Sequence, residues 1–208
     1  MSSVQDFRDR WSRHTPSLMG AARRFAVLCP LIARPEGLSF LFEVRAAGLR
    51  QSGEVCFPGG RAEPGETAVQ CALRETWEEL GIPSRQIEII GQSDFLVHQR
   101  GFLLQPVIGL VEQDALAALR PSPVEVAEVF TVPVSFFQST PPEMLSYRLV
   151  PQLPEDFPYD GIGISPSYAW GSGQVDVPVW RYQGHVIWGM TARILRDILT
   201  HMKAVPES

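Results

Sequence analysis

The feature that most constrains this chain is the segment 60–82, where a glycine-led turn enters a stretch with helical periodicity. At about 100° per residue, one stripe of this stretch is apolar or small. Its members are Val69, Ala72, Leu73, Thr76 and Leu80. Glu75, Glu78 and Glu79 follow the spacing i, i+3, i+4 and gather on another face. The segment therefore predicts an amphipathic core helix that carries three clustered carboxylates.

Three acids on a helix are most often its solvated face, and only their context gives them another role. Clustered carboxylates repel one another by roughly a few tenths of a kcal/mol per pair. A hard cation such as Mg²⁺ or Mn²⁺ relieves this repulsion, because it prefers oxygen ligands and is readily shared with substrate phosphates. The glutamates are therefore candidate ligands of a divalent metal.

The surrounding residues supply that context. Residues 60–82 have the form G-x5-E-x7-R-E-U-x-E-E-x-G-U, where U is a bulky apolar residue, and so resemble the signature of the Nudix hydrolase superfamily. The fixed residues are Gly60, Glu66, Arg74, Glu75, Glu78, Glu79 and Gly81. At frequencies of about 6% each, such a set matches by chance at roughly one start position in 10⁸. Thr76 occupies the first U position, where its methyl group can still face the core.

The resemblance implies metal-dependent cleavage of a diphosphate that is linked to a second group. Glu75 and Glu79, one helical turn apart, are the expected principal ligands of Mg²⁺ or Mn²⁺. Glu78 is expected as a third ligand or as the residue that holds a water on the ion. The carbonyl oxygen of Gly60 is expected as a further ligand.

Two further signature residues are expected to organise this cluster. Arg74 lies beside the glutamates and should orient one of them through a salt bridge. Glu66 is its expected partner or a residue that holds the loop, as the resemblance suggests. With Glu75 and Glu78, these two complete the predicted catalytic residues.

The general base stays open at this point. Within the superfamily it is either a glutamate of the signature or an acid from a distant loop. The distant candidates are Glu125 and Glu128, which lie on opposite faces if their segment is a regular strand. An edge charge and a salt bridge are equally good interpretations of these two. His98 and His185 receive no catalytic role, because a lone histidine is more often structural.

The residues before the signature resemble an additional motif of the coenzyme A diphosphatase branch of this superfamily. The matching residues are Arg45, Ala46, Arg50, Gly53, Phe57, Pro58, Gly59 and Gly60. The gap between Arg50 and Gly53 is one residue shorter than in that motif, and Glu43 stands where the motif has Thr. Alternation along a strand would allow Glu43 to point away from the site. The segment 185–195, HVIWGMTARIL, resembles the closing strand and helix of the same branch.

This flank supplies the predicted substrate-binding residues. They are Arg45, Arg50, Gly53, Phe57 and Gly59. Coenzyme A carries a diphosphate and a separate 3′-phosphate, and arginine is a fork-shaped donor suited to both. Ordinary surface salt bridges are the alternative for the two arginines.

The order of expected elements predicts the α/β class, a mixed sheet with helices on both faces, in agreement with the α/β/α sandwich that the resemblance implies. Strands are expected at 24–33, 38–46, 87–97, 102–111, 124–132, 143–150 and 175–188. Besides the signature helix, helices are expected from Ser2 or Ser3 to about Arg13, at 134–138 and at 190–202. Pro30 suggests an edge position or a bulge in the first strand. Gly81 is the expected C-terminal cap of the signature helix.

The expected organisation is one domain over residues 1–208, with an N-terminal helical extension at 1–23 and the signature at 60–82. Residues 151–174 are rich in proline, glycine and aromatic residues. A disordered linker is one interpretation of them. An ordered surface insertion is the preferred one, because their aromatic side chains are costly to leave in water.

The charge and composition of the chain limit the kinds of partner that we expect it to bind. A net charge of −5 offers no general attraction to a nucleic-acid backbone. Three cysteines without metal-site spacing indicate reduced thiols. The N-terminus is too polar for a signal peptide, and no apolar stretch approaches the length of about 20 residues that spans a bilayer. We therefore expect a cytoplasmic monomer or homodimer that acts on a small-molecule diphosphate.

Three functions compete. The first is hydrolysis of coenzyme A or its derivatives to 3′,5′-ADP and 4′-phosphopantetheine or its acyl form. The second keeps the same metal chemistry but accepts ADP-ribose or another nucleoside diphosphate derivative. The third is a catalytically silent Nudix module that senses a ligand. The complete set of Arg74, Glu75, Glu78 and Glu79 argues against silence.

Overall fold

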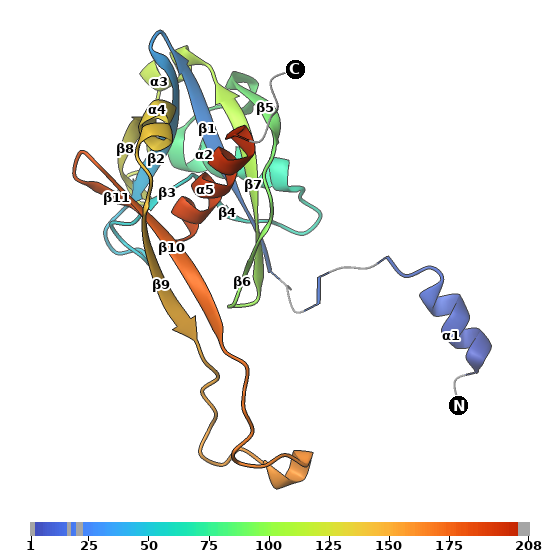
Figure 1. Cartoon of the computed structure of the whole chain (residues 1–208). Helices are drawn as coiled ribbons and strands as arrows, with labels where there is room; N and C mark the ends of the chain where they lie inside the picture. Colours follow the sequence, from blue (N-terminus) through green and yellow to red (C-terminus); the bar gives the residue numbers. More distant parts are fainter. Residues whose placement is uncertain (1–2, 16–17, 20–22, 204–208) are drawn as a thin grey trace.

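A computed structural model describes residues 3–15, 18–19 and 23–203 (Figure 1). Within them, eight strands form a mixed sheet with the order β3-β2-β1-β7-β5, in which β4 pairs with β1, β6 with β7 and β8 with β2. The strands are β1 (Arg23–Arg34), β2 (Gly37–Arg45), β3 (Val55–Cys56), β4 (Gly59–Arg61), β5 (Ile87–Gln92), β6 (Leu96–His98), β7 (Phe102–Val111) and β8 (Val126–Pro133). The strands β1 and β7 are parallel, whereas β1 and β2 are antiparallel. The predicted mixed α/β fold is confirmed.

Helices cover both faces of this sheet (Figure 1). The helix α2 (Ala68–Leu80) packs on one face, over a buried cluster that includes Leu28, Leu41 and Val107. The other face carries α4 (Val134–Ser139) and α5 (Gly189–Lys203). Four residues of α5 are buried there, as its predicted core stripe requires. They are Ile194, Leu195, Ile198 and Leu199.

The predicted core stripe of α2 is correct in part. Ala72, Thr76 and Leu80 are fully buried, but Val69 and Leu73 are only half-buried. Their place is taken by residues on the neighbouring side of the helix, namely Ala68, Cys71 and Glu79. The buried face is therefore rotated toward the carboxylates, because β4 and β1 both pack against this helix.

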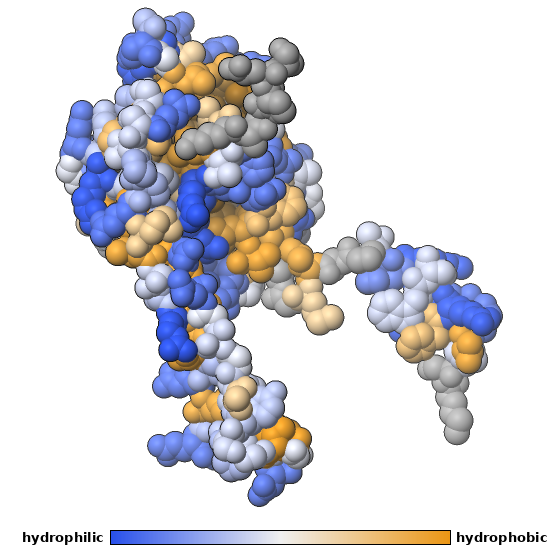
Figure 2. All heavy atoms as spheres, viewed as in Figure 1, coloured by the Kyte–Doolittle hydropathy of each residue, from blue (hydrophilic) through white to orange (hydrophobic). Residues whose placement is uncertain are grey.

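A second sheet has the order β11-β10-β9. Its strands are β9 (Glu143–Leu149), β10 (Gly173–Tyr182) and β11 (His185–Ile187). Strands β9 and β10 extend away from the main body as a long arm (Figures 1 and 2). Beyond their ends, the side chains of Phe157, Tyr159, Tyr168 and Trp170 contact one another in edge-on pairs. Mutual packing thus shields part of the aromatic surface of residues 151–174 from water.

The remaining elements are short. They are α1 (Val4–Trp11), η1 (Ser84–Gln86), α3 (Gln113–Ala117) and η2 (Asp160–Ile162). The helix α1 begins at a Ser3 capping box and stands apart from the body (Figure 1). The helix α3 was not predicted, because five residues are too few to show a helical period. Among the described residues, no helix is long and apolar enough to cross a membrane.

Three sequence expectations about the strands are wrong. Pro30 lies in β1, an interior strand, and not at an edge or bulge. On one side of β1 the partner changes from β4, which ends at Val27↔Gly59, to β2, which begins at Leu31↔Phe40. Pro30 falls between these partners, where its missing N–H costs no ladder hydrogen bond. The expected strand 87–97 is two strands, β5 and β6, both paired with β7. The expected strand 175–188 is also two strands, β10 and β11, which pair with each other.

Candidate active site

The ends of α2 hold the signature helix in place. Thr67 and Gln70 form a reciprocal capping box at its start, with the Gln70 N–H donating to the Thr67 hydroxyl at 3.2 Å. Gly81 ends the helix in the left-handed conformation, with φ 72°, which confirms the predicted cap. The three glutamates therefore sit on a helix whose length is set by its own caps.

Arg74 joins three carboxylates. Its guanidinium group donates to both oxygens of Glu66, from Nε at 2.9 Å and from Nη2 at 3.1 Å. Its Nη1 donates to Glu75 Oε1 at 2.9 Å and to Glu78 Oε2 at 3.0 Å. These bonds lower the pKa of Glu66. Glu66 thus holds one edge of the guanidinium while the other edge orients the glutamates, as the sequence predicts.

Glu79 lies on the buried side of the helix, with 5% of its surface exposed. Its Oε2 accepts a hydrogen bond from the Gly59 N–H at 2.8 Å. Burial raises the pKa of Glu79, and the charge of Glu43 raises it further. This environment favours a neutral carboxyl group unless a cation comes close.

Gly60 leaves room for Glu75. A Cβ at this position would lie 2.3 Å from Glu75 Oε1, closer than real Cβ atoms come to any neighbour. The Gly60 carbonyl, predicted as a metal ligand, accepts a bond from the Cys71 thiol at 3.6 Å. The turn and the helix therefore approach each other only because residue 60 is glycine.

Glu43 faces the cluster, against the expectation that it points away. It is 1% exposed, and its Oε1 accepts a bond from the Cys56 thiol at 3.3 Å. Its Oε2 is buried without a hydrogen-bond partner among the described residues. Leu41, two positions earlier on β2, belongs to the core beneath α2, so strand alternation turns Glu43 toward the same helix. Burial raises the pKa of Glu43.

The structure separates the two distant acids. Glu125 is half-buried, and its charge raises the pKa values of Glu43, Glu75 and Glu79. Glu128 instead pairs with His185, whose Nε2 lies 3.1 Å from Glu128 Oε1. Glu125 therefore acts electrostatically on the signature glutamates Glu75 and Glu79, whereas Glu128 forms an ion pair with His185.

The resulting donor set suits a divalent cation. Carboxylates from α2, β2 and the segment before β8 act on one another here, since burial and the neighbouring negative charges raise the pKa values of Glu43, Glu75 and Glu79. Glu43 Oε2 has no hydrogen-bond partner, and neither Glu43 nor Glu79 has an ion-pair partner among the described residues. Oxygen donors of this kind are the ligands that Mg²⁺ and Mn²⁺ prefer. The residues present therefore fit such an ion.

A cavity of about 520 Å³ adjoins this cluster at Gly59 and Gly60. Five arginines line it: Arg23, Arg45, Arg50, Arg100 and Arg193. Aromatic side chains line it as well, among them Phe25, Phe102, Tyr147 and Trp188. The predicted pair is brought together here, since Arg45 Nε donates to the Arg50 carbonyl at 3.3 Å.

The other predicted substrate residues play different parts. The N–H of Gly53 donates to the Arg45 carbonyl at 3.0 Å, so Gly53 shapes the loop between the arginines. Phe57 reaches the cavity wall, but its ring is buried and stacks on Phe42 with centroids 4.8 Å apart. Sequence reasoning did not identify Arg23, Arg100 or Arg193, because no local motif marks a residue that a distant element brings to a site.

Comparisons with known proteins show what this chain is similar to. The family model described as NUDIX domain matches residues 22–153. The uncharacterized Nudix hydrolase NudL of Photorhabdus laumondii is 33% identical over 204 residues, which cover 95% of this chain and 97% of that protein. The peroxisomal coenzyme A diphosphatase NUDT7 of Mus musculus is 37% identical over 139 residues, 66% of this chain and 57% of that protein. A crystal structure of an Ap4A hydrolase binary complex from C. elegans gives a TM-score of 0.45 at 20% identity, covering 53% of this chain and 80% of that chain.

Proposed function

The chain belongs to the Nudix hydrolase family, and on that premise we propose that it cleaves the diphosphate bond of coenzyme A or of its derivatives, with Mg²⁺ or Mn²⁺. Water attacks one phosphorus of the diphosphate, the bond between that phosphorus and the bridging oxygen breaks, and the bridging oxygen leaves with the other phosphorus. The products are 3′,5′-ADP and 4′-phosphopantetheine or its acyl form. The similarity to the mouse coenzyme A diphosphatase supports this substrate.

The single observation that carries the proposal is the charge of the cavity beside the glutamates. The chain has a net charge of −5, yet five arginines line this one cavity and Glu54 is its one acid among the described residues. None of the five lies within 4.0 Å of a carboxylate in the part of the chain that the structure describes. A substrate with three phosphate groups suits such a surplus of unpaired positive charge.

The signature residues divide the chemistry among them. Glu75 and Glu79, with Glu78 and the Gly60 carbonyl, would hold the divalent ion. When bound, this ion neutralises charge on the diphosphate oxygens and lowers the pKa of an attacking water. Arg74 keeps Glu75 and Glu78 in place through the bonds at 2.9 and 3.0 Å.

The protein also needs a group that accepts the proton of the attacking water. We assign this role to Glu125, because its charge acts on Glu43, Glu75 and Glu79 while it has no ion-pair partner of its own among the described residues. A signature glutamate remains the alternative base. Glu128 is occupied by His185 and is assigned to structure.

A substrate comparison tests the proposal. The protein would be incubated with Mg²⁺ or Mn²⁺ and equal concentrations of coenzyme A, 3′-dephospho-coenzyme A, ADP-ribose and a nucleoside triphosphate, with products followed by mass. We expect selective release of 3′,5′-ADP from coenzyme A, and its loss in a Glu79→Gln variant. Preference for ADP-ribose would keep the chemistry and overturn the substrate. No turnover of any compound would favour a ligand-sensing module.

A further inference from the structure

The arginines of the cavity fall into two groups on different strands. Arg45 ends β2, and Arg50 follows it in the next loop. Arg100 lies in the turn between β6 and β7. β2 and β6 are not neighbours in the sheet, because β1 and β7 lie between them. The cavity therefore offers positive charge at two separate places.

Three arginines converge on the second place. Arg23, at the start of β1, donates from Nη2 to the Arg100 carbonyl at 2.7 Å. Arg193, on α5, lines the same cavity as Arg23, His98 and Arg100. Burial lowers the pKa of His98, and the charges of Arg100 and Arg193 lower it further. Residues from β1, the β6–β7 turn and α5 thus share this part of the cavity wall.

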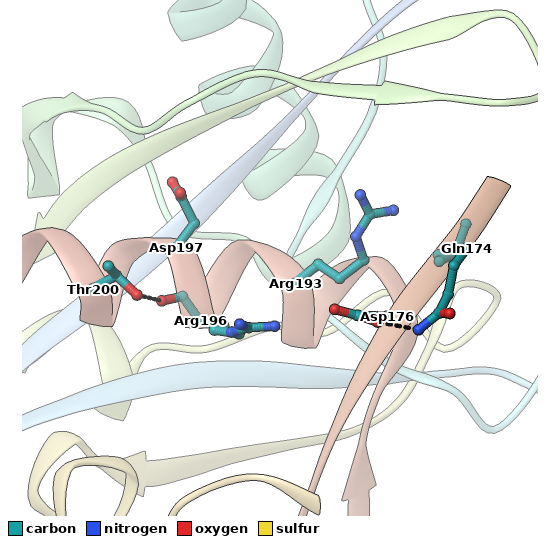
Figure 3. Close-up of a pocket in the computed structure, with 7 residues that line it drawn as sticks. Gln174, Asp176, Arg193, Arg196, Asp197 and Thr200 are labelled. Carbon is teal, nitrogen blue, oxygen red and sulfur yellow. Dashed lines mark hydrogen bonds between the residues drawn. The ribbon is translucent and has the colours of Figure 1, made fainter. Parts of the chain in front are cut away.

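The second group differs from the first in its acidic neighbours. The charge of Arg45 lowers the pKa values of Glu43 and Glu54, so carboxylates lie near it. Arg100 and Arg193 form no ion pair within the described residues. Figure 3 shows the Arg193 guanidinium group turned away from Asp176, the acid on the neighbouring β10. The second group is therefore the place where positive charge is least compensated.

Flat side chains lie beside these arginines. The ring of His98 stacks on Phe102, with centroids 4.4 Å apart and planes 9° apart. The Tyr147 hydroxyl accepts a bond from Gln99 at 2.8 Å, which ties the arm to the β6–β7 turn. Trp188, 44% exposed, also lines the cavity. Aromatic faces next to arginines suit a purine base that carries a phosphate on its sugar.

We propose that Arg23, Arg100 and Arg193 form a subsite for a terminal phosphate group, the 3′-phosphate of coenzyme A, apart from the diphosphate at the glutamates. The proposal rests on the proposed function and names the part of the substrate that this wall recognises. A phosphate monoester carries a charge of about −1.5 to −2 and three acceptor oxygens, which several unpaired arginines match better than one. The subsite would make the enzyme select the 3′-phosphorylated form of its substrate.

The test compares kcat/KM for coenzyme A and 3′-dephospho-coenzyme A. The wild type should prefer coenzyme A by about tenfold or more, the range expected for charge-assisted hydrogen bonds to a phosphate. An Arg100→Gln, Arg193→Gln double variant should lose about tenfold or more on coenzyme A and less than about threefold on the dephospho form. In EDTA, calorimetry should show weaker binding of 3′,5′-ADP to the double variant, with AMP binding changed little.

Arg196→Gln is the matched control. Arg196 lies on the same helix and shares with Arg193 a neighbouring groove between α5 and β10, but it does not line the cavity (Figure 3). It should leave the substrate preference unchanged. Equal losses on both substrates, an unchanged preference in the double variant, or the same loss in Arg196→Gln would overturn the subsite. If the wild type turns over the two substrates equally well, the subsite alone fails, and if it hydrolyses neither, the proposed function fails with it.

Discussion

Replacing Gly60 by alanine should lower the catalytic rate strongly while lowering the stability of the fold only slightly. The new Cβ would lie 2.3 Å from Glu75 Oε1 and 2.4 Å from its Cδ, whereas ordinary contact begins at 3.4 Å. The atoms in the way are the end of a flexible side chain, so the backbone can stay and the carboxylate must move. Glu75 would then leave its place beside Arg74 Nη1, 2.9 Å away in the native protein.

The magnitude follows from this displacement. A shift of about 1 Å in a catalytic arrangement costs about 100-fold in rate. Loss of the Arg74–Glu75 hydrogen bond costs about 1–2 kcal/mol of stability, since the pair is partly exposed. Alanine also restricts the unfolded chain more than glycine does, which raises the free energy of unfolding by about 0.4–1 kcal/mol. The free energy of unfolding should therefore fall by about 1 kcal/mol, which lowers Tm by about 2–4 °C in a protein of this size.

Two other glycines supply the comparison. At Gly59, with φ 156°, a Cβ would lie 2.3 Å from the Ala26 carbonyl oxygen and 2.6 Å from Val27 Cα, both in the backbone of β1. Gly59→Ala should lower the free energy of unfolding by about 3 kcal/mol or more, because neither the backbone of the strand nor that of the turn can move to make room. Gly171 has open space around it, so Gly171→Ala should change neither property.

Urea unfolding and kcat/KM, measured on the best substrate of the wild type, would check all three variants. The account of Gly60 is refuted if Gly60→Ala keeps its activity within about threefold of the wild type. It is refuted equally if Gly60→Ala is destabilised as strongly as Gly59→Ala, because that result would mean that the backbone and not the carboxylate is displaced.

Three further outcomes are expected. Arg74→Lys keeps the positive charge but loses the forked guanidinium group that spans Glu66 and Glu75. In steady-state assays, kcat should fall about 10–100-fold while KM stays within about threefold. An unchanged kcat would contradict this role of Arg74. Glu125→Gln should lower kcat about 100-fold or more, whereas Glu128→Gln should change kcat less than about threefold, and the reverse order would reassign the base. In EDTA, urea unfolding should show stability falling as the pH rises from about 4.5 to about 9, because burial raises the pKa of Glu79 and the native protein keeps a proton that the unfolded chain loses. Glu79→Gln should flatten that dependence, and a stability that rises over this range would exclude a buried neutral Glu79.

Much of the fold could be predicted because its elements carry local signals. The periodicity of 190–202 identified α5 and its buried stripe, and Gly81 marked the end of α2 through its left-handed conformation. Local sequence signals failed where the position of a residue depends on which strands pair with its own strand. Pro30 looked like an edge residue, but a change of partner along β1 accommodates it inside the sheet.

The orientation of the Glu43 side chain could not be predicted from strand alternation alone. Alternation along β2 was readable from the sequence, but it places Glu43 on one of two faces without saying which face α2 covers. Packing of α2 over Leu41 settles that choice. The rotation of the α2 interface likewise buries Glu79, which helical spacing alone had grouped with exposed acids.

The sequence by itself determined the signature helix, its caps and the spacing of its carboxylates, because these depend on residues within a few positions of one another. The resemblance suggested Glu66 as the partner of Arg74 or as a residue that holds the loop, and the structure shows the two side chains paired. Only the tertiary structure decided that Glu43 and Glu125 join the cluster and that Arg23, Arg100 and Arg193 share a cavity with Arg45. The physical reason is that strand pairing and helix packing bring together residues that are far apart in sequence, and no local pattern records which strand lies beside which.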